Sequence, residues 1–173
     1  MNRVTLLALS WCLAIPGLSS AAEKRPVDNG AAQKGTIAEM RDIGTAMMAW
    51  LVEQISEAPP TGAPALAADD AQQPIDWPSC PRASFKELQA VLVPQYIKIL
   101  PERDPWGNPY EFCLDRKDTL RNKNVIGIRS SGRDGVFEGT SYLTGPFDPE
   151  DFDRDLVWLD GYFARWPQKP PSA

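Results

Sequence analysis

The chain has 173 residues, enough for one domain with a buried core and too few for two domains of ordinary size. It carries 18 Lys and Arg against 23 Asp and Glu, and no stretch is strongly basic, which excludes an electrostatic nucleic-acid-binding surface. Histidine is absent, which excludes catalysis by an imidazole base and removes the commonest zinc ligand. Carboxylate chemistry remains, either as a pair of catalytic acids or as oxygen ligands of a hard cation such as calcium.

The first 22 residues have the layout of a secretory signal peptide. A positive charge at Arg3 precedes an apolar run over residues 4–18, and small residues follow at positions 19–22. We predict cleavage after Ala21 or Ala22 and a periplasmic or secreted location. A membrane anchor is the alternative, but the run is too short to span a bilayer comfortably, and no other segment is apolar enough to do so.

Two cysteines, Cys80 and Cys113, lie outside the signal segment. In an oxidising compartment they can form a disulfide, and closing a loop of about thirty residues would contribute roughly 3–4 kcal/mol to stability. The alternative is two unrelated thiols, one in a loop and one in a strand. We predict the disulfide.

A long amphipathic helix is predicted from Gly35 to Glu57. Thr36 and Glu39 form a capping-box pattern at its start, and two prolines at positions 59 and 60 end it. Apolar side chains recur at three- and four-residue steps along this segment, at Ile37, Met40, Ile43, Met47, Leu51 and Ile55. We expect this stripe to face the core rather than a ligand.

Residues 58–82 are rich in Pro and Ala without a sustained period, which predicts an irregular loop. A second, short helix is predicted from Ser84 to Val93. Its start has a capping box formed by Ser84 and Glu87, and Pro94 ends it.

Three strands complete the predicted elements. The turn-rich stretch LPERDPWGNP leads into a strand from Tyr110, a second strand covers Asn124–Ser130 after a polar connection, and a third covers Leu156–Leu159. One long helix, a loop, a short helix and a small antiparallel sheet make an α+β architecture.

Three parts of the sequence resemble a known family. They are the helix segment TIAEMRDIGTAMMAWLVEQ, the stretch LVPQYIKILPERDPWGNPYEF, and SSGRDGVFEG followed later by DRDLVWLD. Together they resemble the major pseudopilin of the bacterial type II secretion system, general secretion pathway protein G, and more broadly type IV pilin-like domains. The middle stretch is the most specific, with its residues Asp104, Trp106, Gly107, Pro109 and Tyr110.

The resemblance implies a pilin-like fold, in which a long N-terminal helix packs on a small antiparallel sheet and a metal-binding loop follows. It covers much of residues 36–160. We therefore divide the chain into four segments: a signal peptide at 1–22, an N-terminal linker at 23–35, a pseudopilin-like domain at 36–166, and a disordered tail at 167–173.

Asp134 is the first candidate ligand. It stands between Gly132 and Gly135 after a predicted strand, and on sequence alone it is most simply a turn former, because aspartate tolerates left-handed backbone and can bond its own main chain. A later segment, FDPEDFDRDLVWLDG, gathers further aspartates. It does not form an EF-hand loop, because Leu156 and Tyr162 stand where that motif requires a glycine and a glutamate.

The resemblance implies a structural calcium ion that bridges these two segments. Asp134 matches the family's glycine-flanked aspartate, Asp155 matches the aspartate two before the x-x-Trp ending, and Asp153 is the third expected ligand. Backbone carbonyl oxygens would complete the shell, and the ion would hold the C-terminal loop in place.

The chain departs from the family at its start and in the loop. The prepilin peptide and the apolar half-helix of about twenty residues are missing, so we do not expect assembly into a pseudopilus core. The longer segment VFEGTSYLTGPFDPED replaces the family's short link within the calcium loop. We therefore expect an exported pseudopilin-like protein that acts through contacts with another protein, such as a secretion or pilus component, and not an enzyme.

Two other functions compete with this interpretation. The first is a carboxylate-dependent, glycosidase-like hydrolase that uses a pair such as Asp134 and Asp155, which needs one acid in an apolar cleft beside a second that stays ionised. The second is a carbohydrate- or peptide-binding module that uses Trp77, Trp158 and Trp166. Exposed indole rings would favour this last function, and buried rings would exclude it.

Overall fold

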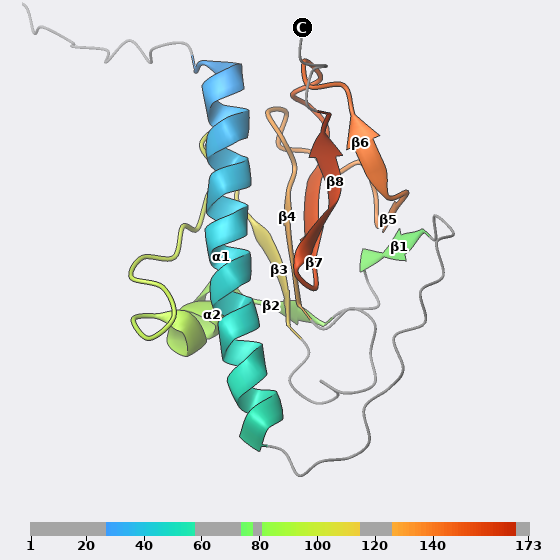
Figure 1. Cartoon of the computed structure of the whole chain (residues 1–173). Coiled ribbons are helices and arrows are strands. Elements are labelled where there is room, and N and C mark those ends of the chain that lie inside the picture. Colours follow the sequence, from blue (N-terminus) through green and yellow to red (C-terminus); the bar gives the residue numbers. More distant parts are fainter. Residues whose placement is uncertain (1–26, 58–73, 78–80, 115–125, 169–173) are drawn as a thin grey trace, which may run out of the picture.

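The computed structural model of the protein describes residues 27–57, 74–77, 81–114 and 126–168. Across these residues a long helix, α1 (Asn29–Glu57), lies along one face of a mainly antiparallel sheet, and a short helix, α2 (Phe85–Leu92), packs beside it (Figure 1). This mixed arrangement confirms the predicted α+β class. The predicted signal peptide at 1–22 lies outside the described residues.

The main sheet has six strands in the order β2-β3-β4-β7-β8-β6. They are β2 (Arg82–Ala83), β3 (Glu111–Leu114), β4 (Ile126–Ser130), β7 (Leu156–Leu159), β8 (Tyr162–Pro167) and β6 (Gly145–Phe147). All neighbours are antiparallel except β6 and β8, which run parallel. A separate pair joins β1 (Ile75–Asp76) to β5 (Ser141–Tyr142).

The three predicted strands are present as β3, β4 and β7, and the sequence did not indicate β8. Pro167 belongs to β8, and the N–H of Gln168 donates to the carbonyl of Phe147 at 2.8 Å, so the chain stays paired past the point where a disordered tail was expected. Residues 169–173 lie outside the described part. The predicted connection between β3 and β4 also lies outside it.

Helix α1 begins at Asn29, ahead of the predicted start at Gly35. Asp28 caps it, because its carboxylate Oδ1 accepts the N–H of Ala31 at 3.1 Å. The predicted cap at Thr36 is wrong: Thr36 lies inside the helix, and its buried hydroxyl donates to the carbonyl of Ala32 at 2.9 Å. Part of the expected linker is therefore helical.

Helix α2 begins as predicted. Ser84 is its N-cap, and its hydroxyl accepts the N–H of Glu87 while the Glu87 carboxylate accepts the N–H of Ser84, which completes the capping box. Leu88 and Leu92 turn from this helix into the core.

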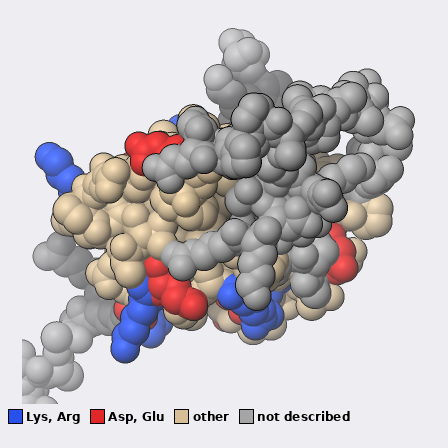
Figure 2. Space-filling model, turned by 90° about the horizontal axis from the view of Figure 1, so that it is seen from below, with Lys and Arg blue, Asp and Glu red and all other residues tan. Residues whose placement is uncertain are grey.

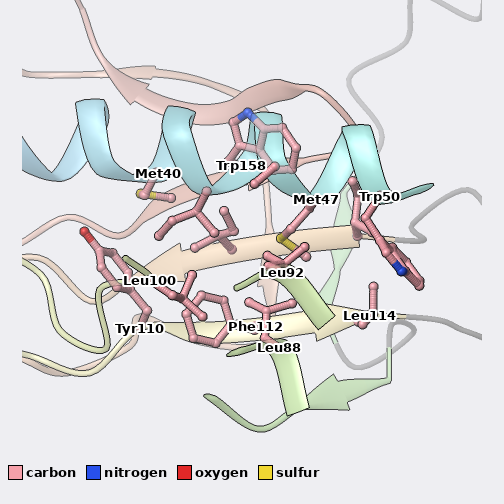
Figure 3. Close-up of a cluster of buried hydrophobic side chains, with 14 of the residues drawn as sticks. Met40, Met47, Trp50, Leu88, Leu92, Leu100, Tyr110, Phe112, Leu114 and Trp158 are labelled. Carbon is pink, nitrogen blue, oxygen red and sulfur yellow. The ribbon is translucent and has the colours of Figure 1, made fainter. Parts of the chain in front are cut away.

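The core fills the space between the two helices and one face of the sheet (Figure 3). Because successive strand residues point to opposite faces, Ile126 and Ile128 of β4 face α1. Gly127 and Arg129 face the other side, where a second apolar cluster covers the sheet. That cluster contains Ile75, Trp77, Cys113, Tyr142, Val157, Leu159 and Ala164. The sheet is thus buried on both faces at β4.

One close contact fixes how α1 sits on the sheet. A Cβ atom at Gly44 would lie 2.5 Å from the indole ring of Trp158, so only a residue without a side chain lets β7 approach the helix this closely. Trp158 is buried among the core residues of Figure 3.

The turn from Asp104 to Tyr110 links the start of α1 to the sheet. Asp104 is buried, and its carboxylate accepts the N–H groups of Trp106 and Asn108 and the hydroxyl of Ser130 at the end of β4, at 2.7 to 3.0 Å. Burial raises the pKa of this carboxyl, and the hydrogen bond from Ser130 opposes the shift. The indole N–H of Trp106 donates to Asn29 at 3.3 Å, which connects the turn to the start of α1.

Candidate functional site

The loop that follows β4 packs directly on the segment before β7. A Cβ atom at Gly132 would lie 2.7 Å from the carbonyl oxygen of Phe152 and 2.8 Å from that of Arg154. Gly132 has a φ of +66°, which glycine adopts without strain. The two segments that the family resemblance pairs are therefore in contact.

Asp134 lies at the exposed tip of this loop. Its Oδ1 accepts the N–H of Val136 at 2.9 Å, which is the turn-forming bond expected of an aspartate at this position. Gly135 beside it has a φ of +72°, and a Cβ there would lie 2.9 Å from the side-chain oxygen of Asn108. The observed contacts of Asp134 are those of a turn residue.

Asp153 is occupied by an arginine. The guanidinium of Arg133 donates to both oxygens of Asp153, at 2.8 Å to Oδ1 and 2.6 Å to Oδ2. This two-pronged pair is partly exposed, and the hydrogen bonds from Arg133 hold the pKa of Asp153 below its usual range.

Asp155 differs from both because it is fully buried. Its Oδ2 accepts the hydroxyl of Tyr142 at 2.7 Å and the N–H of Glu138 at 3.0 Å, whereas its Oδ1 has no hydrogen-bond partner among the described residues. Burial raises the pKa of Asp155 to about 6, although the hydrogen bond from Tyr142 opposes the shift. Burial therefore favours the protonated form of Asp155.

Two further arginines meet at Glu138, which follows the exposed loop. Its Oε2 accepts Arg154 at 3.1 Å, and its Oε1 accepts Arg165 and the N–H of Asp155, both at 3.1 Å. Arg154 also donates to Asp151 at 2.9 Å. These pairs tie the long loop to β7 and β8.

A third charged group lies behind this network on the covered face of the sheet. Arg129 is 2% exposed and donates to Glu111 at 2.6 Å and to the hydroxyl of Tyr142 at 2.6 Å. Its guanidinium stacks over the ring of Phe137, 3.9 Å from the centroid, and over Trp77 at 4.9 Å. Tyr142 thus links the buried arginine to the buried Asp155.

The three predicted calcium ligands do not form one site in this arrangement. Among the described residues no group of three or more acidic, cysteine or histidine side chains is placed to hold a metal ion. Asp134 bonds its own turn, Asp153 pairs with Arg133, and Asp155 is buried. The calcium hypothesis therefore rests on the resemblance and not on the geometry.

Sequence reasoning missed the arginines of this loop. Each stands beside an aspartate in the motifs GRDG and DRD, and this adjacency was the available signal. Spacing alone did not show that Arg133 meets Asp153 or that Arg154 meets Glu138, because these partners lie on separate segments.

Of the two cysteines predicted to form a disulfide, the structure describes Cys113. Cys113 is fully buried in β3 and is disulfide-bonded. In the register of the β2–β3 strand pair, Cys113 lies opposite Arg82 of β2. The predicted partner, Cys80, lies outside the described residues.

A second candidate site is a groove of about 510 Å³ on the helix side of the molecule, which we call the α1 groove. Its helix wall consists of Glu39, Asp42, Thr45, Ala46 and Ala49, and the opposite wall is formed by residues 96–99 and Pro101. The Glu39 carboxylate accepts the hydroxyl of Tyr110 at 2.7 Å. Burial raises the pKa of Glu39, and the negative charges of Asp104 and Asp42 add to the shift.

Two observations bear on the competing functions. Trp77 and Trp158 are 1% and 4% exposed, so only Trp166, at 38%, could offer a ring to a carbohydrate or peptide. For the hydrolase, neither Asp134 nor Asp155 lines the α1 groove or the hollow beside β6.

Figure 2 shows both acidic and basic side chains of the described residues on one face of the molecule. This distribution agrees with the absence of a basic stretch in the sequence. None of the helices in the described part of the chain is long and apolar enough to cross a membrane.

No protein-family model, curated protein or solved structure matches this chain.

Proposed function

We propose that this chain is an exported, pseudopilin-like domain that acts by contacting another protein, in a type II secretion or pilus-like system, and that it is not an enzyme. The observation that supports this most is α1 laid across an antiparallel sheet, with the Asp104–Tyr110 turn between helix and sheet. The resemblance is most specific at this same turn, which leads into β3.

Export is supported by the disulfide bond of Cys113, since disulfides persist in oxidising compartments and are rare in the cytosol. The signal-peptide layout of residues 1–22 agrees with it.

The proposal is tested in the native host with a C-terminally tagged chain. N-terminal sequencing of the tagged protein is expected to begin after residue 21 or 22, and cross-linking in intact cells is expected to join it to one protein of the cell envelope. An uncleaved cytoplasmic chain, or a mature chain that cross-links to no protein, would contradict the proposal.

The calcium part of the hypothesis has its own test. A calcium ion that binds only the folded chain would stabilise it by about 2.7 kcal/mol at a hundredfold excess over the dissociation constant. On this hypothesis we expect thermal unfolding in calcium to occur at a higher temperature than in chelator, and Asp134→Ala to remove the difference. Equal melting temperatures would leave Asp134 as a turn residue and reject a calcium site.

A further inference from the structure

The α1 groove has an apolar half that is open to solvent. Ile99 on its outer wall is 79% exposed, more than any other large apolar side chain in the described part of the chain. Thr45 and Ala49 are exposed on the α1 wall, and their small side chains leave room for another segment near the helix. Ile99 therefore offers an aliphatic side chain to a group that enters the groove.

The other half of the groove is acidic. Glu39 and Asp42 lie one helical turn apart on the wall of α1, and Asp104 is close enough to act on Glu39 electrostatically. No ion pair reaches any of these three carboxylates within the described residues. Lys98 lines the opposite wall and forms no ion pair with them among the described residues.

A positively charged group placed here would gain from the surroundings. Glu39 is half-buried, so water screens its charge less than it screens a fully exposed carboxylate. An ammonium or guanidinium beside Glu39 therefore interacts with it more strongly than at an open surface. The hydroxyl of Tyr110 satisfies one lone pair of that carboxylate and leaves others for an incoming donor.

We infer that the α1 groove docks a segment of another protein that carries a lysine or arginine next to aliphatic side chains, the basic group meeting Glu39 and Asp42 and the aliphatic groups meeting Ile99. This inference rests on the proposed function, because it assigns the surface and the partner chemistry through which the domain acts. A second copy of this chain fits less well, since each copy carries a net charge of −5.

The experiment is a selection from a random twelve-residue peptide library displayed on phage. The full chain is the target, and peptides that also bind the Ile99→Glu variant are removed. Two surface variants outside the groove serve as controls: Leu143→Glu, which alters an aliphatic side chain that is 69% exposed, and Glu150→Lys, which reverses an exposed charge.

We expect the surviving peptides to carry lysine or arginine within one helical turn of aliphatic residues. Fluorescence anisotropy should then show binding that weakens at least tenfold in Asp42→Lys, a variant that took no part in the selection, and by less than twofold in both controls. Survivors without a basic residue, no survivors, or equal binding by Asp42→Lys would overturn the inference.

Two further readouts separate this inference from its alternatives. Sedimentation velocity that shows a dimer of the full chain, and a monomer for Ile99→Glu, would assign the groove to a second copy and overturn the inference. If the envelope protein cross-linked in the native host is captured equally by the wild-type chain and by Asp42→Lys, the proposed function stands and the groove is not the docking surface.

Discussion

Replacing the buried Asp155 by asparagine should change how stability depends on pH. The pKa of Asp155 rises from its ordinary value of 3.8 to about 6 because burial disfavours the charged carboxylate. Between these two values the folded chain holds a proton that the unfolded chain has lost. Stability therefore falls as the pH rises through this window, and the loss is complete above about pH 7.

The size of the effect follows from the shift. The difference between 3.8 and about 6 corresponds to about 3 kcal/mol, at 1.36 kcal/mol for each tenfold change in proton affinity. Asparagine can still accept the hydroxyl of Tyr142, but its amide group would lie where the Oδ1 of Asp155 now has no partner. A buried amide without a partner costs about 1–3 kcal/mol at every pH.

The test therefore compares the free energy of unfolding of the variant with that of the wild type at each pH. The cost of the unpaired amide is the same at every pH, so it does not affect how this difference changes with pH. Urea unfolding of the wild-type chain and of Asp155→Asn should show the variant gaining about 3 kcal/mol relative to the wild type between pH 3 and pH 7. Asp134→Asn, which removes an exposed carboxyl, is the matched reference. A difference that varies by less than about 1 kcal/mol over this range would show that Asp155 is not desolvated, and the reasoning would fail.

Two other substitutions test the packing and the charge network by urea unfolding. Gly44→Ala should destabilise the chain by about 1 kcal/mol or more, although alanine normally favours a helix, because its Cβ would meet the ring of Trp158. Gly139→Ala, where a Cβ meets nothing within 4 Å, should be nearly neutral, and equal effects would contradict the predicted clash. Arg129→Met should lose about 2 kcal/mol, because it leaves Glu111 without its buried partner. Arg133→Ala removes an exposed ion pair and should change the free energy of unfolding little. A larger loss of stability in Arg133→Ala than in Arg129→Met would show that the exposed pairs dominate.

Local chemistry in the sequence determined much of the fold. Ser84 and Glu87 predicted the start of α2, because a capping box depends only on residues three apart. The apolar runs predicted β3, β4 and β7, and the three- and four-residue spacing predicted the buried face of α1. The start of α1 was missed, because a single Asp28 cap is a weaker signal than the apparent box at Thr36.

Tertiary structure alone decided the state of the buried charged side chains and of the pair between Arg133 and Asp153. Strand alternation places Arg129 of β4 on the face away from α1, but only the packing of the β1–β5 pair, with Trp77 and Tyr142, buries that face. Burial then raises the pKa of Asp155. The contact between two segments that are distant in the sequence brings Asp153 next to Arg133. The sequence shows which carboxylates and arginines are present, whereas long-range packing determines which of them pair and which are buried away from water.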